Sequence, residues 1–564
     1  MAKARAFILK RGGIPSTRVF TKVWLALFGE WPWEGIPILP PEVIYLPPWF
    51  PFNIYDFSSW SRGTIVPLTI LMARRPICPL PEGTQLDELF PEGRASTDFS
   101  IPRPRNGLVG WSGFFYLVDK VLHLYERLPW KIGRERAILR AAEWVMAHQE
   151  ADGGWGGIQP PWVYSLIALK ALGYPLDHPV MRKGIEGWKG FLIDEGDEIR
   201  VQACVSPVWD TSLALIALVE SGMPSDHPAL VRAGEWLLQK QVLRPGDWAV
   251  KVKGVEPGGW PFEFANDWYP DIDDTAEVII ALHLVRLPDE GAKRRAMERG
   301  IRWVLGMQSK NGGWAAFDRD NTRTALAKIP FADFGEALDP PSVDVTAHVV
   351  ECLGRLGYDR DPPAVRKALD YISSEQEPDG PWFGRWGVNY IYGTGAVLPA
   401  LEAIGEAMDQ PQVRRAVEWL LSHQNPDGGW GESCASYADP SLKGQGPSTA
   451  SQTAWTLMAL LSAGEGGHPA VERGIRFLLT TQREDGTWDE PYFTGAGFPG
   501  YGTGERLRHH PTLRLRSGQG PGEMGLELPA GFMINYHLYR NYWPLTALGR
   551  YRQFLEGQYG LHPR

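Results

Sequence analysis

The residues most able to do chemistry are three aspartates, Asp271, Asp273 and Asp274, set in an aromatic context. They precede Val278-Ile279-Ile280-Ala281-Leu282, whose apolar character predicts a buried helix. Aspartate is a favourable helix N-cap, so part of the cluster has a purely structural interpretation. Because like charges held close together cannot all ionise, we expect at least one carboxyl group to keep its proton near neutral pH. Facing an aromatic cavity, that group could protonate a weak base such as an alkene.

The composition narrows the class of protein. The chain has 564 residues, enough for two domains, and a formal net charge of -9 without a basic stripe, which argues against a nucleic-acid partner. Its cysteines are scattered without metal-site spacing, so we expect a reduced cytosolic setting. No apolar run reaches the roughly 18 residues of a membrane span, and the first residues lack the features of a signal peptide.

One unit recurs along the chain: an aromatic helix ending in Gln, a Gly-containing turn, and then Trp. The copies end at Trp155, Trp314, Trp382, Trp430 and Trp488, and a looser copy runs from Trp236 through Gln241 to Trp248. The Gln amide can both donate and accept hydrogen bonds, so it could join one helix end to the next turn while Trp covers the joint. We interpret these units as structural.

Apolar helices alternate with these units after about residue 205, and their spacing predicts an all-α fold. We expect residues 205–564 to form a catalytic α/α barrel of six hairpins, with the Asp cluster at one end. Residues 1–204 should form a second domain, with helices over 19–27, 61–73, 113–128 and 163–172 and a loop over 76–109. The inner helices of the catalytic barrel are expected to begin near Asp210, Asp274, Asp344, Tyr392, Ser451 and Tyr539.

At the acidic cluster the chain resembles a known family. Asp271-Ile272-Asp273-Asp274-Thr275-Ala276 matches the Asp-x-Asp-Asp-Thr-Ala motif of bacterial squalene-hopene cyclases, and residues 157–162 and 206–211 also look like that family. The resemblance implies two α/α barrels, with the Gln/Trp units as QW motifs. Family members have a longer upstream segment, so the resemblance implies that the N-terminal barrel is incomplete. The polar, Gly-rich segment 501–531 is expected to be a flexible inserted loop.

The resemblance also implies a reaction. It is protonation of the terminal alkene of squalene, followed by ring closures through carbocations to hopene or hopanol, without a metal or organic cofactor. Asp273 is then the proton donor, Asp271 and Asp274 shape its environment, and His423 hydrogen-bonds the acid cluster. From the residues alone, a structural histidine at a helix end stays open for His423.

Carbocations are stabilised by aromatic faces through cation–π attraction, which is stronger away from water. Each aromatic residue could instead be core packing. The substrate-binding residues that the resemblance implies are Trp60, Trp209, Phe262, Tyr390, Trp455, Phe498, Phe532, Tyr536 and Tyr539, with Ile158, Gln159 and Pro160 near the product end.

Two patterns could instead bind a metal ion. Asp344, His348 and Cys352 have zinc-ligand types at i, i+4 and i+8, but a stripe on one helix rarely closes a tetrahedral site. Residues 273–277 resemble a magnesium motif of class I terpene synthases, without a convincing second motif. We therefore predict no metal site.

The apolar stretch 113–130 is either a core helix or an interfacial membrane anchor. The resemblance favours an anchor in one leaflet, on the cytoplasmic side of a bacterial inner membrane, with squalene as substrate, and leaves a homodimer open. Two alternative functions also stay open. One is a class II cyclase of a prenyl diphosphate, for which we find no basic patch, and the other is a catalytically inactive, truncated cyclase.

Overall fold

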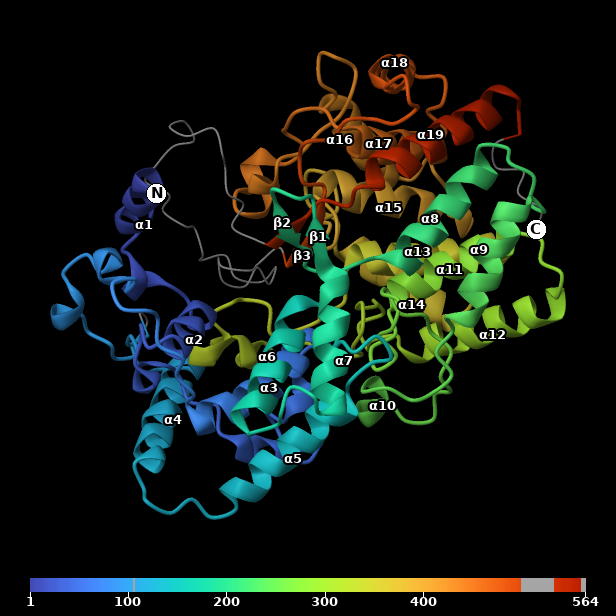
Figure 1. Ribbon diagram of the computed structural model, residues 1–564. Helices are drawn as coiled ribbons and strands as arrows, with labels where there is room; N and C mark the ends of the chain where they lie inside the picture. The colour runs from blue at the N-terminus through green and yellow to red at the C-terminus, as the bar shows by residue number, and fades with distance from the viewer. Residues whose placement is uncertain (105–106, 499–531, 559–564) are drawn as a thin grey trace. The chain divides into compact units, whose positions relative to one another are not determined.

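The computed structural model describes residues 1–104, 107–498 and 532–558. The described residues separate into two compact units, whose helices are drawn in Figure 1. Unit 1 contains Met1–Cys204 and Arg323–Leu338, and unit 2 contains Val205–Thr322 and the described residues from Asp339 onward. The two domains predicted at 1–204 and 205–564 stay a prediction. The two units differ from these domains in the segment Arg323–Leu338, which belongs to unit 1. The predicted inserted loop, 501–531, lies outside the described residues.

Unit 1 is helical and is organised around α3. This helix packs against both α5 and α6, and its side chains are buried over almost its whole length. It begins where the Ser58 hydroxyl accepts the backbone N–H of Ser61, which satisfies one of the free donors of the first turn. The helices are α1 (Ala2–Lys10), α2 (Val19–Leu27), α3 (Ser59–Arg74), α4 (Trp111–Glu126), α5 (Arg134–Ala147), α6 (Gln159–Ala171) and α7 (Pro179–Trp188). The predicted helices near 19, 61, 113 and 163 are therefore confirmed.

Shorter elements complete unit 1. Strands β1 (Leu192–Asp194) and β2 (Ile199–Val201) form an antiparallel hairpin in which Ile193 faces Arg200. The segment predicted as a loop, 76–109, contains only short 3-10 turns among its described residues. The 3-10 helices of the unit are η1 (Ile14–Ser16), η2 (Trp33–Gly35), η3 (Pro41–Tyr45), η4 (Ile54–Asp56), η5 (Asp87–Leu89), η6 (Arg94–Ser96), η7 (Lys189–Phe191), η8 (Thr324–Lys328) and η9 (Pro330–Ala332).

Unit 2 is a barrel of inner and outer helices. In the described part of the chain, six inner helices each pack against the next in chain order, and α19 packs against α8, so the ring closes. The inner helices α11, α13, α15 and α17 are buried over most of their length, and every residue of α17 is buried, which explains why apolar residues occur on all sides of them. The inner helices are α8 (Pro207–Glu220), α11 (Ile272–Leu284), α13 (Val343–Arg355), α15 (Tyr390–Ala403), α17 (Ala450–Ser462) and α19 (Tyr539–Leu555). The all-α prediction and the predicted starts of these helices are confirmed.

The outer helices each pack on the inner helix that precedes them. They are α9 (Pro228–Gln239), α12 (Glu290–Gly306), α14 (Pro363–Ser374), α16 (Pro411–Ser422) and α18 (Pro469–Thr481). Smaller elements are α10 (Trp248–Lys251), η10 (Cys434–Tyr437), η11 (Pro440–Leu442) and the antiparallel pair β3 (Gly495–Phe498) and β4 (Phe532–Ile534).

The Gln/Trp units join the layers by repeated hydrogen bonds. Gln308 Nε2 donates to Gly312 O in its own turn and to Ala364 O in the next outer helix. Trp314 Nε1 donates to Val304 O, while its backbone N–H donates to Thr346 Oγ1 in the following inner helix. The same Gln pattern recurs at Gln149, Gln376 and Gln424, and the same Trp pattern at Trp382 and Trp430.

The looser copy of this unit ends at a different Trp from the one predicted. Trp260, not Trp248, donates its Nε1–H back to Leu237 O, at 2.6 Å, and its backbone N–H to Thr275 Oγ1, at 2.9 Å. Gln241 reaches Gly258 O and Ala296 O. The long turn between Gln241 and Trp260 hides the repeat spacing in the sequence. This joint fixes the start of α11, where the acidic cluster lies.

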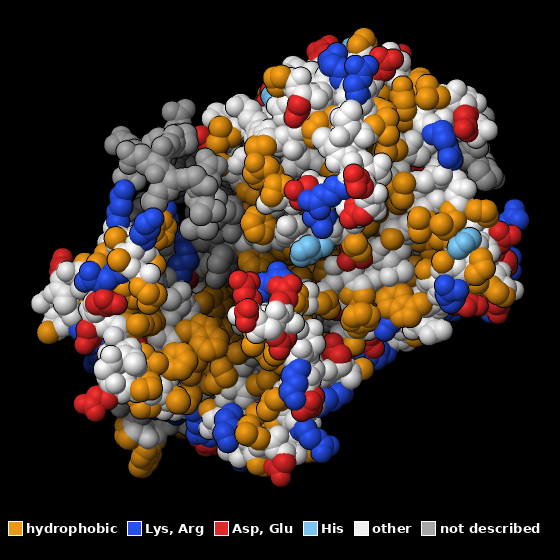
Figure 2. All heavy atoms as spheres, turned by 45° about the horizontal axis from the view of Figure 1, so that its top comes forward, with side chains coloured by type: hydrophobic (Ala, Val, Ile, Leu, Met, Phe, Trp, Pro, Cys, Tyr) orange, Lys and Arg blue, Asp and Glu red, His pale blue; other side chains and the backbone are white. Residues whose placement is uncertain are grey.

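Two surface features bear on the predicted partners. On the face drawn in Figure 2, acidic and basic side chains are interspersed, and no continuous basic patch is visible there. Among the described residues, no helix combines the length and the hydropathy needed to cross a lipid bilayer.

Candidate active site

The acidic cluster is built by the first turn of α11. Asp271 is the N-cap, and its Oδ1 accepts the backbone N–H groups of Asp273, at 2.7 Å, and Asp274, at 3.3 Å. Its own backbone N–H donates to Trp260 O at 2.7 Å. The capping interpretation is therefore correct for Asp271, and this cap sets the direction of the two carboxyl groups that follow.

Asp273 binds a histidine of the neighbouring inner helix. Its Oδ1 lies 2.6 Å from Nδ1 of His348 in α13. Both residues are buried, with 7% and 4% of their surface exposed. A pair of ionisable groups held this closely away from water is the arrangement expected of a tuned acid, because their charges interact strongly there.

The carboxyl groups and the histidine around Asp273 have shifted pKa values. Burial raises the pKa of Asp271 and of Asp274 well above the ordinary value, and neighbouring carboxylates raise both further. Burial lowers the pKa of His348, but the charge of Asp273 and the hydrogen bond to it outweigh burial and raise it to about 10. A cationic His348 stabilises negative charge on the Asp273 carboxyl group.

The prediction that His423 hydrogen-bonds the acid cluster is wrong. His423 is the C-cap residue of the outer helix α16, where its Nδ1 lies 2.7 Å from Trp419 O and its ring lies against Trp419. The structural interpretation of His423 is the correct one. The histidine that contacts Asp273 is His348. The sequence signal that could have found it is its position four residues after Asp344, which places the imidazole one turn past the start of an inner helix.

The three zinc-ligand types on α13, which the sequence analysis considered and did not favour as a metal site, have separate contacts. Asp344 Oδ2 accepts the backbone N–H groups of Arg385 and Trp386, at 2.9 and 2.7 Å, whereas His348 binds Asp273. Burial raises the pKa of the Cys352 thiol, and the charges of Glu277 and Glu351 raise it further. Among the described residues, no group of three or more His, Cys, Asp and Glu side chains is arranged to hold a metal ion.

Several predicted aromatic residues form one contiguous set in unit 2. Trp209 Nε1 donates to Tyr539 Oη at 3.1 Å, and its ring centroid lies 6.3 Å from that of His348. Tyr539 stacks on Tyr536 at 4.4 Å and meets Trp455 edge to face at 5.9 Å. Tyr536 in turn meets Phe262 at 6.3 Å. Aromatic faces thus continue from the Asp273–His348 pair through Trp209 to Phe262.

Tyr390 does not join this set, and Tyr392 does. The ring of Tyr390 packs against Phe383 at 5.7 Å and beneath Lys443 Nζ at 4.7 Å. Tyr392, which the sequence analysis did not select, lies 6.0 Å from His348 and 4.7 Å from Trp455 between ring centroids. Residues two apart on a helix point in different directions, so only one of the two tyrosines can face the acid. The prediction of Tyr390 is corrected to Tyr392.

The remaining predicted residues lie elsewhere. Phe498 and Phe532 face each other at 5.8 Å across β3 and β4 in unit 2. In unit 1, buried Trp60 donates its Nε1–H to Glu336 O at 2.7 Å. Half-buried Ile158, Gln159 and Pro160 form the start of α6 in the same unit, where the Gln159 N–H donates to Ala203 O.

Comparison with known proteins agrees with this geometry. Family models described as the squalene-hopene cyclase N-terminal and C-terminal domains match residues 1–197 and 205–503. The squalene–hopene cyclase of Alicyclobacillus acidocaldarius subsp. acidocaldarius is 50% identical over 559 residues, with 99% of this chain and 82% of that protein covered. Dammaradiene synthase of Dryopteris crassirhizoma is 42% identical, with 99% and 80% covered. The squalene–hopene cyclase of Zymomonas mobilis subsp. mobilis is 41% identical, with 98% and 80% covered.

These matches extend over nearly the whole chain, and they include both the barrel of unit 2 and the acidic turn at the start of α11. The chain belongs to the squalene-hopene cyclase family and is a class II triterpene cyclase.

Proposed function

We propose that this chain cyclises squalene to hopene or hopanol, with Asp273 as the acid that starts the reaction. The observation that carries the proposal is the buried Asp273–His348 pair beside a contiguous aromatic set. The Asp273 proton adds to the terminal alkene, and the positive charge moves along the chain as carbon–carbon bonds close the rings. Loss of a proton from the last cation gives hopene, and addition of water gives hopanol.

The aromatic set suits the cations of this reaction. The rings of Trp209, Tyr392 and Trp455 are buried. A buried ring stabilises a cation by about 2 kcal/mol or more, because water does not compete with the ring for the cation. A ring face stabilises positive charge without donating a lone pair that would trap it.

Asp273→Asn tests the acid, because the amide keeps the size of the side chain and removes its transferable proton. We expect hopene formation from squalene in detergent micelles, measured by gas chromatography, to fall by at least about 10²–10⁴-fold. The exposed Asp361→Asn is the matched control and should keep its rate. Near wild-type turnover by a folded Asp273→Asn, checked by circular dichroism, would remove Asp273 from this role.

We further propose that α4 inserts into one leaflet of a bacterial inner membrane, on its cytoplasmic side. Its exposed residues Phe114, Leu117 and Val121 are 48%, 48% and 65% accessible and recur at helical spacing on one face. Phe115 belongs to the other face, where it is buried against Phe52. A 16-residue helix with one apolar face exposed is typical of an interfacial anchor.

Binding to vesicles tests this anchor. We expect Phe114→Ser, Leu117→Ser and Val121→Ser together to lower partition into phosphatidylglycerol vesicles at least about tenfold, since apolar area is lost from the interface. The control replaces Leu139, Leu243 and Leu479 by Ser, which are 58%, 60% and 57% exposed. Equal partition of the two variants would contradict the anchor.

The Gln/Trp units are proposed to be the QW motifs of the family. The Gln308 and Trp314 hydrogen bonds support a structural role, because they join backbone groups of adjacent layers.

A further inference from the structure

A cavity at one end of the unit 2 barrel lies apart from the acid. Its volume is about 680 Å³, and small-molecule sites span roughly 300–1,000 Å³. The inner helices α8, α11, α13 and α19 have their C-terminal ends at its wall, and α12 begins there. Exposed Arg286 and Glu290 also belong to the wall, so the cavity opens to the surface.

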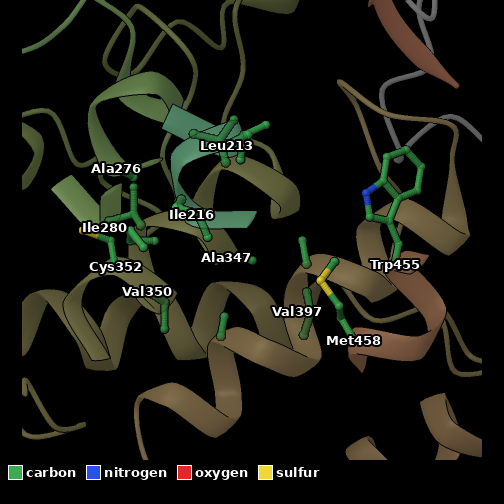
Figure 3. Close-up of a cluster of buried hydrophobic side chains, with 14 of the residues drawn as sticks. Leu213, Ile216, Ala276, Ile280, Ala347, Val350, Cys352, Val397, Trp455 and Met458 are labelled. Atoms are coloured by element: carbon green, nitrogen blue, oxygen red, sulfur yellow. The ribbon is translucent and has the colours of Figure 1, made fainter. Parts of the chain in front are cut away.

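Packed apolar side chains lie between this cavity and the acidic turn. On α11, Asp273 is in the first turn and His283 comes ten residues later, about 15 Å along the axis at 1.5 Å per residue. The apolar core of the barrel occupies the middle of these helices, and Figure 3 shows Ile216 of α8, Ile280 of α11 and Val350 of α13 within it. The cavity is therefore a site separate from the acid.

Three nitrogen-bearing side chains converge on the cavity from different helices. His283 comes from α11, Lys293 from α12 and Arg355 from α13. The side chains of Lys293 and Arg355 are only 11% and 8% exposed. Burial lowers the pKa of His283, and the charges of Lys293 and Arg355 lower it further, so the imidazole is mainly neutral at pH 7. Two cations and a neutral imidazole thus face one space.

These side chains have hydrogen-bond donors that the protein leaves unused. Lys293 Nζ donates to Val285 O at 2.7 Å and lies 2.7 Å from Glu290 Oε2, and an ammonium group has a third N–H. Val285 follows the last residue of α11, and carbonyl groups at a helix end attract cations, which explains part of this placement. The His283 ring has no hydrogen-bond partner among the described residues. A bound acceptor would use both groups.

The wall has an excess of positive charge. Behind it, Arg550 pairs with Glu220 at 2.6 Å and Glu351 pairs with Arg355 at 2.8 Å, so these outer partners add one charge of each sign. In the wall itself three cations face two carboxylates, namely Arg286, Lys293 and Arg355 against Glu220 and Glu290. The excess of one positive charge favours an anionic ligand.

We propose that this cavity binds a small organic anion with a short apolar body. Its phosphate or carboxylate head contacts His283, Lys293 and Arg355, because an oxyanion accepts hydrogen bonds from all three. The apolar body packs against the remaining wall, which includes Val219 and Leu287. Squalene has no polar group, so this ligand differs from the proposed substrate, and the proposal does not depend on the cyclisation.

Binding should change the protonation of His283. In the empty cavity Lys293 and Arg355 disfavour a second positive charge on the ring. An anion within hydrogen-bond distance favours that charge instead. The ligand should therefore raise the pKa of His283 from below 6.5 to above 6.5. Nuclear magnetic resonance of the chain with ¹³C-labelled histidine measures this value, and the His283 signal is the one that is lost in His283→Leu.

Calorimetric titration of the full chain with phenyl phosphate and with benzoate tests the site. Neutral phenol reports what the apolar body contributes alone. We expect at least one of the two anions to bind at least about tenfold more tightly than phenol, and the tighter anion identifies the head group. His283→Leu removes a donor without breaking a bond of the fold, so it should weaken that binding at least about tenfold.

The control is His178→Leu, a half-buried histidine of unit 1 whose Nδ1 also has no partner among the described residues. Its affinity for the anion should equal that of the wild type. Equal affinity of the wild type for phenol and both anions, or unchanged anion affinity in His283→Leu, would overturn the site. If His283→Leu does not fold, exposed Arg286→Gln decides, with an expected loss of about threefold and an unchanged affinity as the contrary result.

Discussion

The acidic site of the inner layer and the Gln/Trp units that join the layers of the unit 2 barrel differ in how their polar groups are hydrogen-bonded. In the outer layer the polar groups of the Gln308 unit are satisfied: Gln308 bridges two backbone carbonyls, and Trp314 bonds both an outer helix and an inner one. In the inner layer Asp274 Oδ1, Tyr392 Oη and Trp455 Nε1 are buried without a partner among the described residues. The outer layer stabilises the ring, and this stability lets the inner layer hold groups whose burial is costly.

The two histidines give the sharpest test of this comparison, because one lies in each layer. We expect His348→Asn to lower the rate of hopene formation by about 10²–10⁴-fold, since the Asp273 carboxylate loses its cationic partner. The rate of His423→Asn should stay within about twofold of the wild-type rate. His423 lies away from Asp273 and hydrogen-bonds the end of its own helix, at Trp419 O. The rate of hopene formation at steady state is measured by gas chromatography. A larger loss of rate in His423→Asn than in His348→Asn would contradict the assignment of His348 as the partner of Asp273.

Thermal stability against pH checks the same pair. The pKa of His348 is raised from 6.5 to about 10 in the folded chain, so the stability that it contributes is fully present below pH 6.5 and is lost as the pH rises through 10. The melting temperature of the wild type should therefore fall by several degrees between pH 7 and 10. A curve for His348→Asn as steep as that of the wild type would contradict the charge assigned to this residue.

The two tyrosines of α15 test whether position within the inner layer matters. We expect Tyr392→Leu to slow cyclisation about tenfold and to increase early-quenched, partly cyclised products, because its ring meets both His348 and Trp455. Tyr390→Leu should leave the product pattern unchanged, since its ring packs on Phe383. Identical product profiles for the two variants, resolved by gas chromatography, would show that the ring of Tyr392 has no special position.

The smallest effect on chemistry is expected in the outer layer. Gln308→Ala removes two hydrogen bonds to buried carbonyls and should cost about 1–3 kcal/mol, seen as a lower melting temperature. The cyclisation rate per folded molecule should stay unchanged at 25 °C. A fall in that rate without a change in stability would mean that the joint also positions the acid.

The fold of unit 2 could be predicted because each inner helix has local signals. A polar first turn followed by residues that are apolar all round marks the starts of α8, α11, α13 and α17 within one or two turns. The Gln-to-Trp spacing marks the outer layer in the same way, except at Gln241, where a long turn carries the chain to Trp260. Local patterns fail where the connecting segment changes length.

The members of the candidate site were harder to predict than the helices that hold them. Five residues that the family resemblance indicated lie in one contiguous set, and their role in substrate binding stays a prediction: Trp209, Phe262, Trp455, Tyr536 and Tyr539. His348 was noticed only as a metal-ligand type, and Tyr392 was passed over for Tyr390. In both cases the deciding contact joins different helices, as between His348 and Asp273, which are 75 residues apart.

The sequence by itself determined the all-α class, the inner helix starts and the identity of the acidic turn, because periodicity and capping act within a few neighbouring residues. Only the tertiary structure decided which histidine binds Asp273 and which tyrosine lies against that histidine. Those outcomes depend on the rotation of each helix about its own axis when the ring closes. Packing against both neighbours sets that rotation, and no single segment of the chain contains the information.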